Sequence, residues 1–169
     1  MGKTYFRSLV GSEEDCDRLI RTCQQILAGD RQIVLIYGAG NNGKSYFVNQ
    51  FKQLFGPDEV TEFQPEFALG CCRNKKLAIC QDPGDVDGLL NKLVLASGGN
   101  FASVIVLSNA KPIGKPAEVQ AFQFTQTFTD PMFKISVDEL RDCLEGRPHT
   151  DVATFSHLPL SERSAPAGL

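Results

Sequence analysis

A glycine-rich segment between Gly38 and Ser45 has the residue types and the spacing that hold phosphate groups. Its sequence, GAGNNGKS, fits the pattern G-x-x-x-x-G-K-[ST], in which glycines allow backbone amides to converge on phosphate oxygens. Lys44 is expected to reach the outer phosphates, and the hydroxyl of Ser45 is expected to ligate Mg²⁺. The residues predicted to bind the nucleotide are Gly38, Ala39, Gly40, Asn41, Asn42, Gly43, Lys44, Ser45 and Tyr46.

The segments on either side of this loop supply the structural context that the motif requires. Residues 32–37, QIVLIY, are apolar and rich in β-branched types, which predicts a buried strand. Residues 44–55 repeat apolar side chains at helical spacing and are followed by Gly56 and Pro57, which predicts a helix that ends there. A helix that begins at the loop presents its positive end to a bound anion. The context therefore favours a phosphate-binding loop over a glycine-rich turn that fits the pattern by chance.

Two further predicted strands end in polar side chains that suit nucleotide chemistry. Residues 75–82 form an apolar run that leads through Gln81 to Asp82, whose carboxylate is a candidate for the Mg²⁺ shell or for positioning water. Residues 103–109 form a third run that ends at Asn109, whose amide is a candidate for sensing the outer phosphate. Both ends also suit ordinary turns. Ligands of parallel α/β sheets bind at the carboxyl ends of strands, so one crevice would collect the loop and both side chains.

The alternation of helices and buried strands predicts a three-layer α/β fold with a mainly parallel central sheet. The chain of 169 residues fits one domain. We expect an N-terminal helical segment at 1–30, a nucleotide-binding domain at 31–146 and a flexible tail at 147–169. The remaining expected elements are helices at 12–29, 85–96 and 137–146 and strands at 59–63 and 119–124, with Asp85 and Asp87 at the start of the second of these helices.

Composition and charge exclude several classes of protein. With 42% hydrophobic and 22% charged residues the sequence is of an ordinary globular type, and no apolar run approaches the roughly 18 residues of a membrane span. The net charge of −3 provides no general attraction to nucleic acid, so a polyanion site would have to be a local patch. The six cysteines form no C-x-x-C pair, which favours reduced, packing thiols in an intracellular chain over a metal or redox site.

The order of the motifs resembles that of the superfamily 3 helicases of small DNA viruses, such as the papillomavirus and parvovirus replication proteins. GAGNNGKSYF resembles their Walker A motif, KKLAICQDP occupies the place of Walker B, and SVIVLSN resembles the motif C strand with its sensor asparagine. The similarity extends from Gln32 to Leu144. It implies a P-loop NTPase fold of the AAA+-like type, with ATP and Mg²⁺ as cofactors. It also implies a hexameric ring that threads a nucleic-acid strand through its pore. The role implied is DNA replication in the host nucleus. Without this resemblance, the expected compartment is the cytoplasm.

Three departures from that family bear on activity. Its Walker B strands commonly end in two acids, whereas Gln81 takes the first place here. The interval between the Walker B and motif C strands has no room for the family's basic DNA-gripping hairpin, and Lys92 is its sole cation. The place of the family's arginine finger holds Glu118 and Gln120, and no arginine follows until Arg141. Loss of such a finger can lower the rate by on the order of 10³–10⁵.

Three functions remain open from the sequence. The motif order favours an ATPase. The departures favour a non-catalytic, nucleotide-gated module that joins a ring of helicase subunits. The length also suits a small P-loop kinase, although the chain has no arginine between Arg73 and Arg141 to form a lid over the phosphates. For the ATPase, the predicted roles are phosphate binding by Lys44, Mg²⁺ binding by Ser45 and Asp82, water positioning by Asp82 or Gln81, and phosphate sensing by Asn109.

The partners expected from the sequence are a nucleotide and other copies of the chain in a hexamer-like ring, or partner helicase subunits. Single-stranded DNA is a further candidate that the overall charge does not support, and no membrane partner is expected. The basic run Arg73, Lys75 and Lys76 is one candidate for a polyanion patch or for a contact with a neighbouring subunit. Its alternative interpretation is the solvated entrance of a strand.

Overall fold

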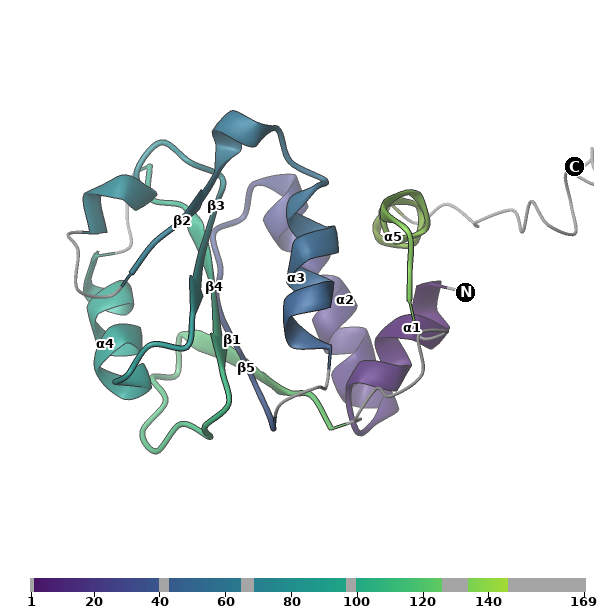
Figure 1. Cartoon of the computed structure of the whole chain (residues 1–169), viewed down its shortest axis with the longest axis horizontal. Coiled ribbons are helices and arrows are strands. Elements are labelled where there is room, and N and C mark those ends of the chain that lie inside the picture. The colour runs from purple at the N-terminus through teal and green to yellow at the C-terminus, as the bar shows by residue number, and fades with distance from the viewer. Residues whose placement is uncertain (1, 40–42, 65–68, 97–99, 126–133, 146–169) are drawn as a thin grey trace, which may run out of the picture.

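The protein is described by a computed structural model over residues 2–39, 43–64, 69–96, 100–125 and 134–145. The fold alternates helices with short strands, and the helices and strands at the expected places confirm the α/β prediction (Figure 1). In chain order, the elements are α1 (Gly2–Leu9), α2 (Glu13–Ala28), β1 (Ile33–Tyr37), α3 (Lys44–Lys52), η1 (Pro57–Glu59), β2 (Val60–Glu62), η2 (Leu69–Cys72), β3 (Leu77–Gln81), α4 (Val86–Ala96), β4 (Ser103–Ser108), β5 (Val119–Gln123) and α5 (Val137–Leu144).

The five strands form one sheet in the order β2-β3-β4-β1-β5, and all four neighbouring pairs are parallel. β4 therefore lies between β1 and β3. The register pairs Tyr37 with Ser108 and Gln81 with Leu107, so these three strands end at nearly the same level. Their carboxyl ends lie at the lower edge of the sheet in Figure 1, which is the edge predicted to hold the site.

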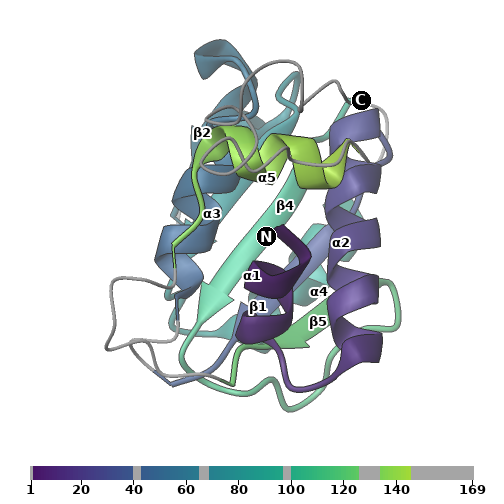
Figure 2. The same cartoon turned by 90° about the vertical axis from the view of Figure 1, so that its right-hand side faces the viewer.

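Helices cover both faces of the sheet, because successive strand residues point to opposite sides. Val34 and Ile36 belong to the apolar cluster formed with α1, α2, α3 and α5, whereas Leu35 belongs to the cluster formed with α4. Figure 2 shows α5 lying across α2 and α3 on the side away from the sheet. The six cysteines all lie within the described residues and form no disulfide bond, and Cys16, Cys23, Cys72 and Cys80 are buried.

The start and end of α2 agree with the local sequence signals. The Ser12 hydroxyl accepts a hydrogen bond from the Asp15 amide at 3.1 Å, and Gly29 ends the helix with φ 97°. The preceding helix α1 was not resolved by the sequence patterns, and its apolar residues Phe6 and Leu9 are fully buried. A helix of eight residues gains most of its stability from such packing rather than from propensity.

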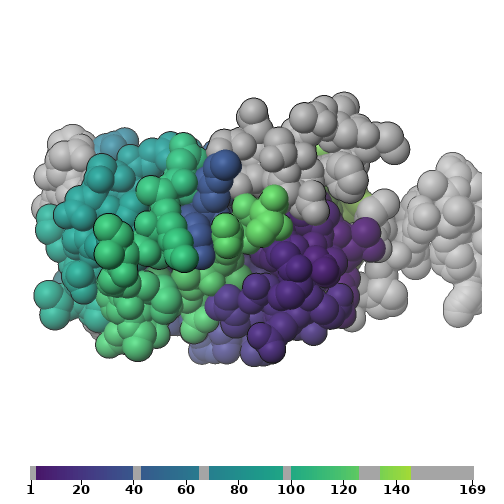
Figure 3. Space-filling model, turned by 90° about the horizontal axis from the view of Figure 1, so that it is seen from below, coloured from purple at the N-terminus to yellow at the C-terminus, as the bar shows by residue number. Residues whose placement is uncertain are grey.

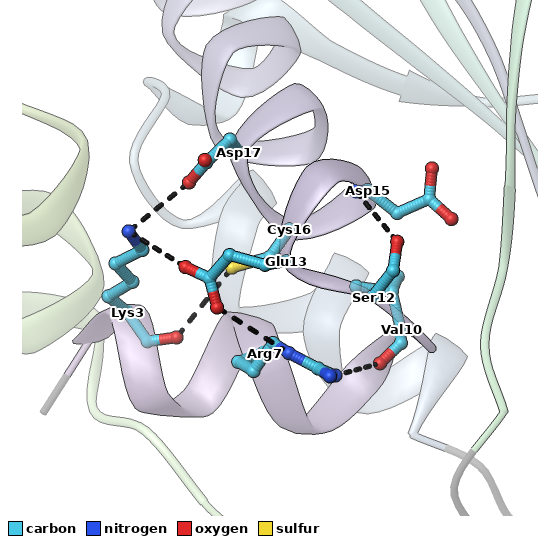
Figure 4. Close-up of polar contacts among 8 residues, drawn as sticks. All are labelled: Lys3, Arg7, Val10, Ser12, Glu13, Asp15, Cys16 and Asp17. Carbon is cyan, nitrogen blue, oxygen red and sulfur yellow. Dashed lines mark hydrogen bonds and ion pairs between the residues drawn. The ribbon is translucent and has the colours of Figure 1, made fainter.

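Charged side chains join α1 to the first turns of α2 (Figure 4). The Lys3 ammonium lies 3.0 Å from the Glu13 carboxylate and 3.3 Å from that of Asp17, and Arg7 lies 3.6 Å from Glu13. These carboxylates raise the pKa of Lys3. The side chains are about half exposed, so they orient α1 more than they stabilise it.

The helix predicted at 44–55 is shorter than expected. α3 ends at Lys52, and the next three amides bond to carbonyls three residues back, including Leu54 to Phe51 at 3.0 Å. Such i to i−3 bonds tighten the last turn of a helix before it stops. β3 likewise begins at Leu77 rather than at residue 75. The side chains of Lys75 and Lys76, which precede it, bind the backbone and the Glu59 carboxylate of η1.

Phe47 links α3 to two other elements and should be critical for folding. Its ring lies 5.7 Å from that of Phe6 in α1 and 6.0 Å from that of Phe124 after β5. We expect Phe47→Ala to lower the free energy of unfolding by about 3–5 kcal/mol, since it leaves a cavity among these rings. Phe55→Ala, at a half-buried position of the same cluster, should cost less than half as much in a denaturant titration. Equal losses would contradict this account of the core.

Candidate functional site

The described ends of the glycine-rich loop have backbone conformations that favour glycine. Gly38 has φ 152° and Gly43 has φ 82°, and Gly43 is the N-cap of α3. Positive φ values are favourable for glycine and costly for most other residues. Residues 40–42, which were predicted to bind phosphate, lie outside the described residues.

Lys44, the first residue of α3, is held beneath the loop. Its ammonium donates hydrogen bonds to the carbonyl oxygens of Gly38 and Ala39 at 2.8 and 3.0 Å, and only 8% of the residue is exposed. Burial lowers the pKa of Lys44, and the negative charge of Asp82 opposes that shift. The predicted phosphate-binding ammonium and the predicted metal-binding carboxylate therefore interact electrostatically.

Ser45 and Tyr46 occupy the first turn of α3 in different environments. Ser45 is exposed, which leaves its hydroxyl accessible to a ligand. Tyr46 is half-buried, and its hydroxyl donates to the carbonyl oxygen of Ile135 at 2.7 Å. Gln50 donates to the same oxygen at 3.0 Å. The side chain of Tyr46 thus anchors the segment before α5, and its predicted contact with nucleotide would have to come from its backbone or ring.

Asp82 directly follows β3 and has an unusual backbone conformation. Its φ is 50°, in the left-handed region, and its amide donates to the Leu107 carbonyl oxygen at 2.8 Å. Aspartate and asparagine tolerate this region better than most other residues. Gln81 and Asp82 are both exposed at the carboxyl edge, so either side chain can meet a ligand or water there.

Asn109 is exposed at the same edge and is held by its neighbours on both sides. The preceding Ser108 is buried, and its hydroxyl exchanges hydrogen bonds with the backbone of Ala110 at 3.0 and 3.1 Å. The Ser108 carbonyl oxygen accepts from the Gly38 amide at 3.2 Å. The backbone of Asn109 is therefore tied to the first glycine of the phosphate loop.

The structure brings Gly38, Lys44, Asp82 and Asn109 to one edge. Figure 3, seen from below, faces this edge, and the blue end of β1 borders the green segment that follows β4. The described residues contain no group of three or more His, Cys, Asp or Glu that could hold a metal ion by themselves. Ser45 and Asp82 suit Mg²⁺, which is commonly bound by one or two protein oxygens together with substrate phosphates and water.

The basic run before β3 lies at the opposite, amino edge of the sheet. Arg73 packs 5.5 Å from the ring of Phe101. Lys75 donates to the Asp58 carbonyl oxygen at 2.8 Å, and Lys76 pairs with the Glu59 carboxylate at 2.9 Å. These contacts favour the interpretation of the basic run as the solvated entrance of β3. They also hold the run at the edge of the sheet opposite to the predicted nucleotide site of the same chain.

Sequence analysis missed the role of Arg18 in α2. Its guanidinium lies 4.1 Å from the centre of the Phe122 ring and donates to the Gln120 side chain at 3.0 Å and to the Ala121 carbonyl oxygen at 2.8 Å. Gln120, which with Glu118 stands where superfamily 3 helicases carry an arginine finger, thereby attaches α2 to β5. The arrangement joins residues far apart in the chain, so no local pattern indicated it.

Comparison with known proteins supports the fold. No family model matches the sequence, and no curated protein matches it. Among solved structures, the fold is similar to that of the apo C-terminal region of NrS-1, with a TM-score of 0.59 and 12% identity over 85% of this chain and 41% of that one. A candidate ATPase from Cytophaga hutchinsonii matches with a TM-score of 0.38 and 11% identity over 84% of this chain and 60% of that one.

The chain thus spans well under half of the NrS-1 region that it resembles. The parallel five-stranded sheet, its strand order and this likeness together show an α/β fold of the P-loop NTPase type. Within the described residues, no helix has both the length and the hydropathy that crossing a bilayer requires.

The left-handed backbone of Asp82 predicts a difference between two substitutions. Asp82→Asn and Asp82→Ala both remove the charge near Lys44, but alanine is the less suited to φ 50°. We expect Asp82→Ala to be less stable than Asp82→Asn by about 1 kcal/mol in denaturant unfolding. Identical unfolding midpoints would show that this conformation carries no strain for alanine.

Proposed function

We propose that the chain binds a Mg²⁺–nucleoside triphosphate, with ATP as the expected nucleotide, at the carboxyl edge of the sheet and hydrolyses it. The observation that carries the proposal is the meeting of three features at one edge: the phosphate loop with Lys44, the carboxylate of Asp82 and the amide of Asn109. A glycine-rich turn formed by chance would not place a buried lysine within electrostatic reach of the acid that ends another strand.

Each residue would have a distinct part in the reaction. The loop amides and Lys44 bind the β and γ phosphates, while Ser45 and Asp82 bind Mg²⁺ directly or through water. Water attacks the γ phosphorus, the bond to the β–γ bridging oxygen breaks, and ADP, phosphate and a proton are released. Asp82 or Gln81 positions this water. The exposed amide of Asn109 contacts the γ phosphate.

We further propose a superfamily 3 helicase-like ATPase, as in replication proteins of small DNA viruses, that assembles with other copies of the chain. The motif order and the placement of β4 between β1 and β3 support this assignment. Single-stranded DNA is the proposed substrate of a complete ring, although the net charge of −3 makes a strong contact by this chain alone unfavourable.

A non-catalytic module that joins a ring of active subunits is the second candidate. Gln81 replaces the first acid of the Walker B strand, and Gln120, one of the two residues at the finger position, is bound by Arg18. Arg141, the next arginine in sequence, pairs with Asp138 at 3.1 Å on α5. Such a module would bind nucleotide tightly but would hydrolyse it only beside a partner, or not at all.

ATP turnover by the purified protein across a concentration series, with and without single-stranded DNA, separates the two candidates. Turnover that rises cooperatively with protein concentration supports a self-assembling ATPase in which a neighbouring copy supplies a cation. Stimulation by DNA supports a motor. Tight nucleotide binding without turnover at any concentration would instead establish the regulatory module.

Lys44→Ala tests nucleotide binding itself. Removing an ammonium that binds phosphate should weaken ATP affinity by about 10- to 100-fold, the equivalent of one hydrogen bond to a charged group. Isothermal titration of parent and variant measures the change, and Lys92→Ala, an exposed lysine on α4, controls for net charge. Unchanged affinity in Lys44→Ala would sink the phosphate-loop assignment.

Asp82→Asn tests hydrolysis apart from binding. The substitution suits the backbone at this position and removes the charge that organises Mg²⁺ and water. We expect ATP affinity to change little and turnover to fall by about 100-fold or more. A variant that hydrolyses ATP at the parent rate would remove Asp82 from the mechanism.

A further inference from the structure

Asp87, in the first turn of α4, binds the backbone of the segment that joins β4 to β5. Its carboxylate accepts hydrogen bonds from the Ile113 amide at 3.1 and 3.2 Å and from the Gly114 amide at 3.0 Å. Two consecutive amides that converge on one anion form a compact, directional attachment. The helix-start prediction for Asp87 located it correctly but did not foresee this contact.

The attachment gives the segment after Asn109 a fixed place relative to another element. Ser108 and Lys115 also hold the segment, but only at its two ends next to the strands: Ser108 in β4 bonds to Ala110, and Lys115 donates to the carbonyl oxygens of Pro116 and of Val119 in β5 at 3.2 and 3.0 Å. Ile113 is 96% exposed, so its side chain contributes almost no apolar burial that would hold the loop here. The Asp87 carboxylate therefore ties the segment to α4.

The helix that carries Asp87 is in turn closely joined to Asp82. Only the short stretch 83–85 separates Asp82 from α4, and Pro83 within it is buried. Asp85 accepts a hydrogen bond from the Gly88 amide at 2.9 Å, and a Cβ at Gly88 would collide with that carboxylate. This end of α4 consequently holds a defined position next to Asp82.

We propose that Asp87 is a positioning residue that fixes Asn109 relative to Asp82 and thereby supports turnover without contributing to nucleotide binding. The inference rests on the proposed function. The phosphates are assigned to the β1–α3 loop and Lys44, whereas the carboxylate of Asp87 binds the segment after Asn109, and the attacking water and the γ phosphate must meet Asp82 and Asn109 together. A misplacement of about 1 Å between reacting groups can cost on the order of 100-fold in rate.

The test compares Asp87→Ala and Asp87→Asn with the parent in steady-state hydrolysis and in ATP titration. Asp87→Ala removes both acceptors and should lower kcat by about 10- to 100-fold, with ATP affinity within about twofold of the parent. Asp87→Asn keeps one side-chain oxygen that can accept from both amides, so it should retain most of the parental kcat. Asn91→Ala, one turn along α4, is the matched control, because its side chain bonds only to the Asp87 carbonyl oxygen among the contacts described.

Several outcomes would overturn the inference. These are a parental kcat in Asp87→Ala, an Asp87→Asn variant as slow as Asp87→Ala, or a fall in affinity and thermal stability that matches the fall in kcat. Amide hydrogen exchange gives a readout that needs no turnover: Asp87→Ala should accelerate exchange at Ile113 and Gly114, and unchanged protection there would refute the attachment. A parent that binds ATP but shows no turnover in any assembly would overturn the ATPase proposal, and it would be recognised before any variant is compared.

Discussion

The position of β4 between β1 and β3 is the constraint on which the candidate site depends. The hydrogen-bond ladder continues past the strands, because the Gly38 amide bonds to Ser108 and the Asp82 amide bonds to Leu107. The phosphate loop and the strand-ending acid are thus attached to consecutive carbonyl groups at the end of one fully buried strand. A shift of β4 along its axis would move both, so the packing of the apolar core sets the geometry of a polar edge.

The charge that a ligand would meet at this edge depends on nearby groups rather than on the net charge of the chain. The chain carries a net charge of −3, yet under the proposed function a polyphosphate would meet a buried ammonium whose partners include the backbone carbonyl oxygens of Gly38 and Ala39. Burial disfavours the charged form of Lys44, and Asp82 favours it. A bound phosphate and Mg²⁺ would replace these weak partners with full charges in a partly dehydrated site, where such interactions are stronger than in water.

Local sequence patterns predicted the elements of this edge but not the contacts between them. The strands before Gly38, Asp82 and Asn109 are short apolar runs that end in loop or polar residues. Such runs predict these strands correctly because the strands are buried. The contact between Asp87 and Ile113 joins residues 26 positions apart, and an acid in the first turn of a helix is equally well explained by capping. Arg18 was missed for the same reason, since its partners lie about a hundred residues away.

The hydrogen bond between Arg18 and Gln120 restricts the positions from which an arginine finger could reach the phosphates. β5 is an edge strand of the sheet, and the guanidinium of Arg18 covers the Ala121 carbonyl oxygen and the Phe122 ring. An arginine placed at Gln120 would meet this cation and could not keep the attachment of α2. An arginine finger at position 120, one of the two candidate places, would therefore conflict with the stability of this edge. Under the proposed mechanism, charge beyond Lys44 and Mg²⁺ would come from a different position or from a neighbouring subunit.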